Sequence, residues 1–123
     1  ESYLEHQGAK FVERFDANTY LRICEMWSRY DPVVEAGAED LATLFGRSAA
    51  AGHHYLVFSI DEDYCFYPEE QAALVENLRD AGVPHLFFTV HSEKGHDSFL
   101  LEPDLYTPHI QVMLRNACED PAE

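Results

Sequence analysis

The spacing of hydrophobic residues predicts two helices in the first 32 residues. The first begins at a capping-box motif, Ser2-x-x-Glu5, and ends near Asp16. The second is capped by Asp16 or Asn18 and is stopped before Pro32. We expect the two helices to form a hairpin. Its apolar face is rich in aromatic rings, which favours packing over a ligand pocket, and consists of Leu4, Phe11, Val12, Phe15, Tyr20, Ile23, Cys24, Trp27 and Tyr30.

The pattern then alternates between strands and helices. A near-continuous apolar run from His54 to Ile60 is typical of a strand buried on both faces of a parallel sheet, and a second apolar strand runs from His85 to Val90. Between them a helix begins at Pro68 and ends before Gly82. This β-α-β unit predicts an α/β fold in which the carboxyl ends of both parallel strands lie at one edge of the sheet. The buried stripe of its helix is Leu74, Val75, Leu78 and Ala81.

Two further helices flank this unit. A short one is expected from about Glu39 to Phe45 and stops at Gly46. The last begins near Pro108 and is capped by Thr107. Its expected buried residues are Ile110, Met113, Leu114 and Ala117, and residues 119–123 are expected to be a frayed tail.

Composition narrows the classes of function. A chain of 123 residues with 46% hydrophobic content forms at most one domain. Its formal net charge of -15 argues against binding to nucleic acid or to an anionic membrane surface, because both need clustered Lys and Arg. The 3 cysteines show no CxxC spacing and the chain has no run of eighteen apolar residues, so we expect a cytoplasmic protein with reduced thiols.

One histidine and one acid stand where the two strands end. His96 lies in a Gly-His-Asp turn after the second strand, and Asp63 follows the first. In isolation, His96 reads as an ordinary hydrogen-bonded loop histidine. Paired with Asp63, it supplies two parts of a nucleophile-His-acid arrangement, in the order expected of an α/β-hydrolase.

Three blocks of the chain resemble the homoserine O-acetyltransferase family. Residues 60–68 (Ile-Asp-Glu-Asp-Tyr-Cys-Phe-Tyr-Pro) with Gln71 resemble the acid-bearing loop of that family, and residues 95–102 (Gly-His-Asp-Ser-Phe-Leu-Leu-Glu) are similar to its Gly-His-Asp-x-Phe-Leu segment. Residues 1–20 are similar to its helical cap. The resemblance implies the C-terminal part of an α/β-hydrolase fold at residues 33–123, preceded by part of a helical cap at residues 1–32 that forms a homodimer.

The resemblance also implies a reaction. The family transfers an acetyl group from acetyl-CoA to the hydroxyl of L-homoserine, a step towards methionine, through an acyl-serine intermediate and without a cofactor. Asp63 would be the triad acid, His96 the general base, and Asp97 a residue that holds the amino group of the substrate. His is suited to take the serine proton, and a carboxylate fixes its tautomer. Asp97 has the alternative role of capping its own turn.

This sequence departs from the family pattern in several places. Asp61 and Glu62 stand directly before Asp63, so which of the three acids faces His96 is open, although the spacing to Pro68 favours Asp63. Lys94 replaces the aromatic or small residue that often precedes the family's Gly-His-Asp. The segment Gly-Arg-Ser-Ala-Ala at residues 46–50 follows a helix, and we reject it as the elbow that would carry the nucleophile.

Because no nucleophile is found, the chain is expected to be the C-terminal third of an acyltransferase and to be inactive alone. The alternatives are a homoserine O-succinyltransferase, a serine O-acetyltransferase or an esterase of the same fold, and a non-catalytic domain that associates through the aromatic hairpin. The histidines show no HExxH or comparable spacing, so no metal site is predicted. We expect Cys65 to be a small buried hydrophobic residue, with a reactive thiol as the alternative.

Overall fold

A computed structural model describes the backbone of residues 2–119 and the side chains of residues 2–116. The contacts within the chain divide it into two units, Glu1–Gly37 and Ala38–Glu123. The division falls a short way after the predicted boundary at residue 32. We describe each unit by itself.

The first unit contains the two predicted helices and a third, short one: α1 (Tyr3–Arg14), α2 (Ala17–Arg29) and α3 (Pro32–Glu35). The capping box of Ser2 and Glu5 at the start of α1 is confirmed. Asp16, and not Asn18, caps α2, since its Oδ1 accepts a hydrogen bond of 2.9 Å from the amide of Thr19. Asp31 caps α3. The sequence pattern predicts only that this residue ends α2, and it also begins another helix.

The prediction that α1 and α2 form a packed hairpin is wrong. The rings that connect the two helices lie beside the link between them, where Phe11 stacks on Phe15 at 5.5 Å and meets the edge of Tyr20 at 6.4 Å. Phe15 and Asp16 both have extended backbones, which carries α2 away from α1 instead of back along it. Of the described residues of α1 and α2 none is buried, and Trp27 is 75% exposed. The aromatic face is therefore exposed in this chain.

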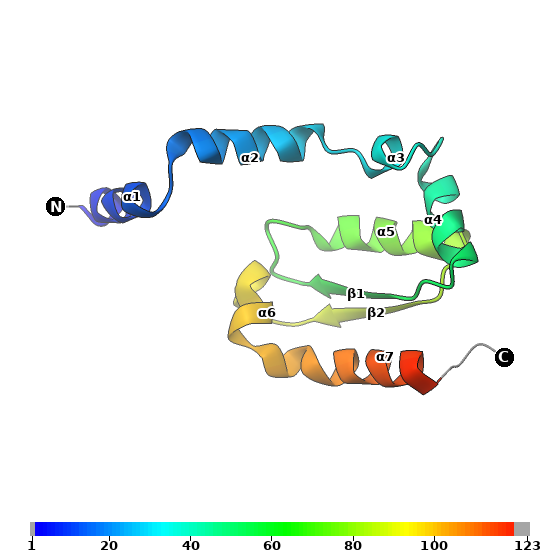
Figure 1. The fold of residues 1–123 in the computed structure, drawn as a ribbon. Helices are drawn as coiled ribbons and strands as arrows, with labels where there is room; N and C mark the ends of the chain where they lie inside the picture. The colour runs from blue at the N-terminus through cyan, green and yellow to red at the C-terminus, as the bar shows by residue number, and fades with distance from the viewer. Residues whose placement is uncertain (1, 120–123) are drawn as a thin grey trace. The chain divides into compact units, whose positions relative to one another are not determined.

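The second unit is built on two parallel strands. β1 (Tyr55–Ile60) pairs with β2 (His85–Val90), and α5 (Pro68–Asp80) connects them. The register runs from Tyr55 opposite His85 to Ile60 opposite Val90. Both strands therefore end at the same edge of the sheet, as Figure 1 shows. The predicted β-α-β unit and the α/β class are confirmed.

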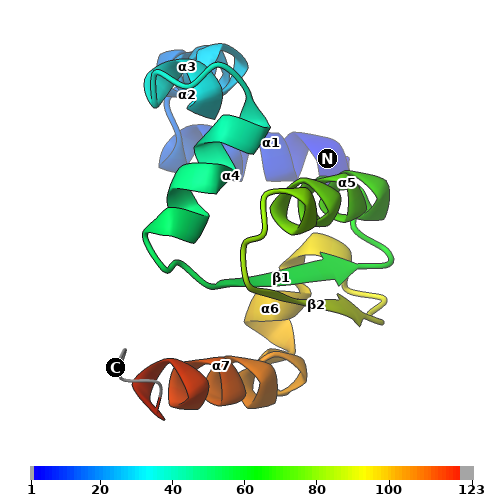
Figure 2. The ribbon, with the colours of Figure 1, turned by 90° about the vertical axis from the view of Figure 1, so that its right-hand side faces the viewer.

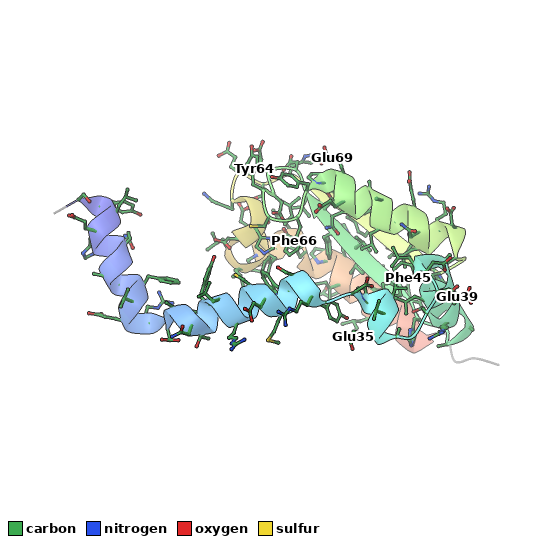
Figure 3. All side chains as sticks on the ribbon, turned by 90° about the horizontal axis from the view of Figure 1, so that it is seen from above. Glu35, Glu39, Phe45, Tyr64, Phe66 and Glu69 are labelled. Atoms are coloured by element: carbon green, nitrogen blue, oxygen red, sulfur yellow. The ribbon has the colours of Figure 1, made fainter. Side chains whose placement is uncertain are left out.

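Helices cover both faces of this sheet (Figures 1 and 2). Neighbouring strand residues point to opposite faces, so Val57 faces α5 while Phe58 faces Tyr106, just before α7 (Thr107–Glu119), and His109 within it. The core on the α5 side also includes Phe45 of α4 (Leu41–Ala50), which is labelled in Figure 3. Its buried residues are Phe45, Val57, Val75, Leu78 and Val83, with the predicted Leu74 and Ala81 partly buried against them.

The helix predicted to stop at Gly46 continues to Ala50. α4 spans Leu41–Ala50 and is capped by Asp40, whose Oδ1 accepts the amide of Thr43 at 2.7 Å. A glycine inside a helix costs only about 1 kcal/mol, and the additional turn places Ala49 against the core. The residue with a left-handed backbone is instead Gly52, with φ of +71°.

Three short helices connect β2 to α7: η1 (Gly95–Asp97), α6 (Ser98–Leu101) and η2 (Pro103–Leu105). Only the turn at residues 95–97 was predicted. α7 begins at Thr107, whose hydroxyl donates to the carbonyl of Pro103 at 2.8 Å. The expected burial of α7 is wrong for Ile110 and Leu114, which are 42% and 60% exposed, because little of the chain covers that face. Ala117 lies outside the described side chains.

Leu78 is the side chain on which the α5 face of the sheet depends most, since it is fully buried. We expect Leu78→Ala to lower the free energy of unfolding by about 2–5 kcal/mol, because it removes buried methyl groups and leaves a cavity. Urea unfolding of the protein measures this loss. Glu76→Ala, an exposed change in the same helix, is the control. Similar small effects for both variants would contradict the assigned core.

Candidate active site

The structure brings Asp63 and His96 together beyond the ends of the two strands. Oδ2 of Asp63 lies 3.0 Å from Nδ1 of His96. The side chain of Asp63 is 5% exposed and that of His96 is 38% exposed. A buried acid is thus hydrogen-bonded to one nitrogen of a partly accessible imidazole.

The loop after β1 holds the Asp63 carboxylate in place. Its other oxygen, Oδ1, accepts backbone hydrogen bonds from Cys65 at 2.7 Å and from Phe66 at 2.9 Å. The Asp63 amide itself donates to the carbonyl of Ile60 at 3.1 Å, which ties the loop to the last residue of β1. An Asp that accepts amides two and three residues ahead forms a local turn. One oxygen therefore fixes the acid, and the other remains for His96.

The pKa of Asp63 reflects two opposing effects. Burial raises the pKa, because it penalises the charged carboxylate. The hydrogen bonds from His96 and from the amides of Phe66 and Cys65 favour the charged form and outweigh burial, so the pKa lies below its ordinary value. Asp63 is therefore ionised at neutral pH and can stabilise a protonated imidazole.

The neighbouring acids have other partners, which answers the question left open by the sequence. Asp61 accepts Nδ1 of His91 at 2.7 Å and the amide of Ser92 at 3.1 Å. The Glu62 carboxylate accepts the hydroxyl of Tyr64 at 3.3 Å, and Tyr64 lies on the exposed side of the loop (Figure 3). Asp63 is thus the acid that faces His96.

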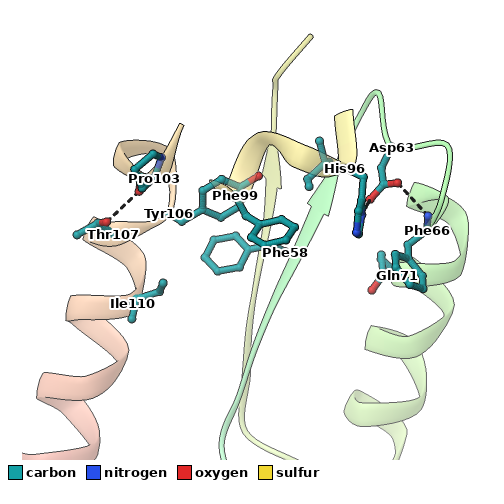
Figure 4. A pocket seen from close by; sticks show the side chains of 11 residues that line it. Phe58, Asp63, Phe66, Gln71, His96, Phe99, Pro103, Tyr106, Thr107 and Ile110 are labelled. Carbon is teal, nitrogen blue, oxygen red and sulfur yellow. Dashed lines mark hydrogen bonds and ion pairs between the residues drawn. The ribbon is translucent and has the colours of Figure 1, made fainter. Parts of the chain in front are cut away.

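A pocket of about 620 Å³ opens beside His96 (Figure 4). Among the described residues none hydrogen-bonds to Nε2 of His96, and this nitrogen belongs to a ring that lines the pocket. Phe66 and Phe99 contact the imidazole, with ring centroids at 5.1 and 5.6 Å. The full lining is Phe58, Ile60, Asp63, Phe66, Gln71, His96, Phe99, Pro103, Tyr106, Thr107 and Ile110.

Sequence reasoning missed most of this apolar wall. Phe66, Phe99 and Tyr106 lie within a few residues of the acid, the histidine and α7, and their aromatic character was the available signal. Tyr106 is nearly buried, and its hydroxyl shares a hydrogen bond with that of the fully buried Ser98. This bond fixes the short helix that directly follows His96.

Two residues differ from the expectations for them. Cys65 is exposed, not buried. Asp97 is also exposed, does not line the pocket and makes no side-chain hydrogen bond that caps α6. A role for Asp97 as a cap of its turn therefore has no support.

The loop that carries His96 passes directly against the acid loop at Gly95. Gly95 is buried and has a φ of +54°, and a Cβ atom there would lie 2.6 Å from the backbone oxygen of Glu62. Side chains rarely adopt this backbone conformation, and the neighbouring atom belongs to backbone that cannot rotate away. A glycine is therefore needed for the two loops to approach.

The chain is similar over nearly its whole length to curated homoserine O-acyltransferases. It is 37% identical over 116 residues to "Homoserine O-succinyltransferase" of Nitrosomonas europaea, which covers 94% of this chain. It is 38% identical over 122 residues to "Homoserine O-acetyltransferase" of Gluconobacter oxydans, and 41% identical over 107 residues to that of Zymomonas mobilis, which cover 99% and 86% of this chain. These relatives are enzymes of the transferase class.

The chain spans only 28–30% of the length of these relatives. No protein-family model matches it. Within residues 2–119, no helix is long and apolar enough to cross a bilayer. In that same part of the chain, no three His, Cys, Asp or Glu side chains are grouped so that they could hold a metal ion.

The contact at Gly95 predicts a difference between two glycine substitutions. Gly52 has a similarly positive φ of +71°, but nothing lies within 4 Å of a Cβ added there. Gly52→Ala should therefore cost only the backbone term, about 1 kcal/mol, and Gly95→Ala about 1–3 kcal/mol more from the collision with Glu62. Urea unfolding of both variants measures the difference. Equal losses would contradict the close approach of the loops.

The lowered pKa of Asp63 predicts a pH-dependent contribution to stability. Because the folded-state pKa is below the ordinary value of about 3.9, the stabilisation is complete above that value and is lost as the pH falls through the folded-state pKa. The stability gap between the wild type and Asp63→Asn should therefore narrow as the pH is lowered from about 7 to about 3. Urea unfolding across this range measures the gap. A gap of constant size would contradict the assigned environment of Asp63.

Proposed function

We propose that this chain is part of a homoserine O-acyltransferase, in which Asp63 and His96 are the acid and the base of a Ser-His-Asp triad. The observation that carries the proposal is the buried Asp63 carboxylate at 3.0 Å from Nδ1 of His96, with the imidazole at the wall of a pocket. The identity of 37–41% to proteins named for this activity supports the choice of reaction.

The geometry suits His96 to transfer protons in both halves of such a reaction. Asp63 accepts the Nδ1 proton, so the neutral imidazole carries its lone pair on Nε2. Nε2 takes the proton of the nucleophilic serine as its oxygen attacks the thioester, and returns it to the departing CoA sulfur. It then takes the homoserine hydroxyl proton as that oxygen attacks the acyl-serine, and gives it to the serine oxygen as the ester bond breaks. Asp63 stabilises the imidazolium in each half.

The nucleophile is proposed to lie in a part of the protein outside this chain. An elbow serine needs a sharp turn between a strand and a helix, whereas residues 46–50 lie within α4. Ser48 is hydrogen-bonded to the hydroxyl of Tyr55 at 3.1 Å, at the opposite end of β1 from His96. The chain alone is therefore expected to be inactive.

The two remaining family assignments are also proposals. Asp97 is an exposed carboxylate next to His96 in sequence, and on the family resemblance alone it is proposed to bind the amino group of an amino-acid acceptor. The first unit is proposed to be part of a helical cap whose exposed aromatic residues, such as Trp27, form a homodimer interface. The acyl donor is acetyl-CoA or succinyl-CoA, since relatives carry both names.

An acyl-transfer assay on the full-length protein that contains this chain tests the proposed function. Free CoA is followed from acetyl-CoA and from succinyl-CoA, each with L-homoserine, with L-serine and with water alone. Release that requires homoserine with one donor is the expected result. Release with water alone would indicate an esterase, release that requires serine a serine acyltransferase, and no release a non-catalytic domain.

The role of His96 predicts a loss of turnover without loss of folding. His96→Ala should lower kcat by roughly 10⁴- to 10⁶-fold, the range seen when a triad member is removed, because it removes the group proposed to take the hydroxyl proton. The thermal midpoint should change little, since the imidazole is partly exposed. His53→Ala, a change at an exposed histidine, is the matched control. Near-normal turnover in His96→Ala would contradict the assignment.

A further inference from the structure

A second acid-histidine pair lies beside the first. Oδ2 of Asp61 is 2.7 Å from Nδ1 of His91, and its Oδ1 accepts the amide of Ser92 at 3.1 Å. Asp61 is the first residue after β1, and His91 is the first after β2. One carboxylate therefore connects the ends of the two strands from which the Asp63 and His96 loops depart.

Ser92 extends this connection to the far side of the histidine loop. Ser92 is buried. Its hydroxyl donates a hydrogen bond to Oε2 of Glu102 and accepts one of 3.0 Å from the amide of Lys94. Glu102 is the C-cap residue of α6, directly after its last residue, Leu101. The segment that carries His96 is thus fixed at its start by Asp61 and at its end by Glu102.

We propose that Asp61 is a positioning residue that acts through His96, because its bonds to His91 and Ser92 hold the histidine loop at hydrogen-bond distance from Asp63. The effect of Asp61 on catalysis rests on the proposed function. Its effect on the position of the histidine loop rests on the structure alone. Neither Asp61 nor His91 lines the pocket, so Asp61 is not expected to touch a substrate.

The exposure of the His91 side chain indicates that its bond to Asp61 positions the loop and contributes little to folding. The His91 side chain is 80% exposed, and ion pairs between exposed groups contribute little to stability. The backbone also keeps the two strand ends paired without the carboxylate, because the Asp61 amide donates a hydrogen bond of 3.1 Å to the carbonyl of Val90. Loss of the Asp61 carboxylate should therefore shift His96 relative to Asp63 without unfolding the unit.

Kinetics of Asp61 variants in the full-length enzyme test the proposal. Asp61→Ala should lower kcat about 10- to 100-fold, as expected for a small misplacement of a catalytic group, with KM within about threefold. Asp61→Asn keeps an oxygen that accepts the Ser92 amide and should recover most of the loss. Glu62→Ala is the matched control, because the Glu62 carboxylate contacts the exposed Tyr64 hydroxyl and no part of the histidine loop.

A double variant shows whether Asp61 acts through His96. In a His96→Ala background, Asp61→Ala should cause no further loss, because the group that it positions is gone. An equal loss in both backgrounds would overturn the proposal, as would an equal loss in Glu62→Ala and Asp61→Ala.

Proton NMR gives a readout that does not depend on activity. The Nδ1 proton of His96, held by Asp63, should give a downfield resonance that is lost or broadened in Asp61→Ala and retained in Asp61→Asn and Glu62→Ala. If the resonance is absent from the wild type or unchanged in Asp61→Ala, the proposal is wrong. An inactive wild type with the expected changes would contradict the proposed function and leave the positioning role of Asp61 supported.

Discussion

The parallel pairing of β1 with β2 is the constraint on which the rest of this structure depends. Since Ile60 lies opposite Val90, the chain leaves both strands at one edge. Two antiparallel strands of this length would end about 20 Å apart at opposite edges of the sheet, so the segments that carry Asp63 and His96 would leave from different edges. The pairing in turn depends on α5, which returns the chain to the start of β2 and buries Leu78 against the sheet.

The two loops give the acid and the histidine different environments. Asp63 is buried and ionised, and a buried charge is tolerated only when hydrogen bonds satisfy it. Its three donors are the Cys65 and Phe66 amides and His96. His96 uses one nitrogen for this contact and remains partly exposed. A fixed anion behind an accessible imidazole is an arrangement that favours proton transfer at Nε2.

Local signals predicted the elements that determine the site. The apolar runs of β1 and β2, with Pro68 and Gly82 at the ends of the helix between them, predict a β-α-β unit, which places Asp63 and His96 at one edge of the sheet. The choice of Asp63 among three adjacent acids rested on spacing, and the contacts of Asp61 and Glu62 agree with it. The catalytic role assigned to the pair stays a prediction.

Tertiary packing decided the features that the sequence did not predict. Gly46 reads as a helix end, but packing of Ala49 on the core extends α4 past it. The apolar stripes of α1, α2 and α7 do not indicate whether another part of the chain covers them. Trp27 and Leu114 belong to such stripes and are exposed. The bond between Asp61 and His91 joins residues thirty positions apart in sequence, and no local pattern indicates it.

The most direct test of the account is a double-mutant cycle on Asp63 and His96 in the full-length enzyme, with kcat/KM as the readout. If the Asp63 carboxylate acts only by orienting His96 and stabilising its charged form, Asp63→Asn should lower kcat/KM by on the order of 10⁴-fold in the wild-type background. In a His96→Ala background it should lower kcat/KM by no more than a few-fold. The same large loss in both backgrounds would show that the two residues act independently, and would contradict the acid-base pair on which the proposed function rests.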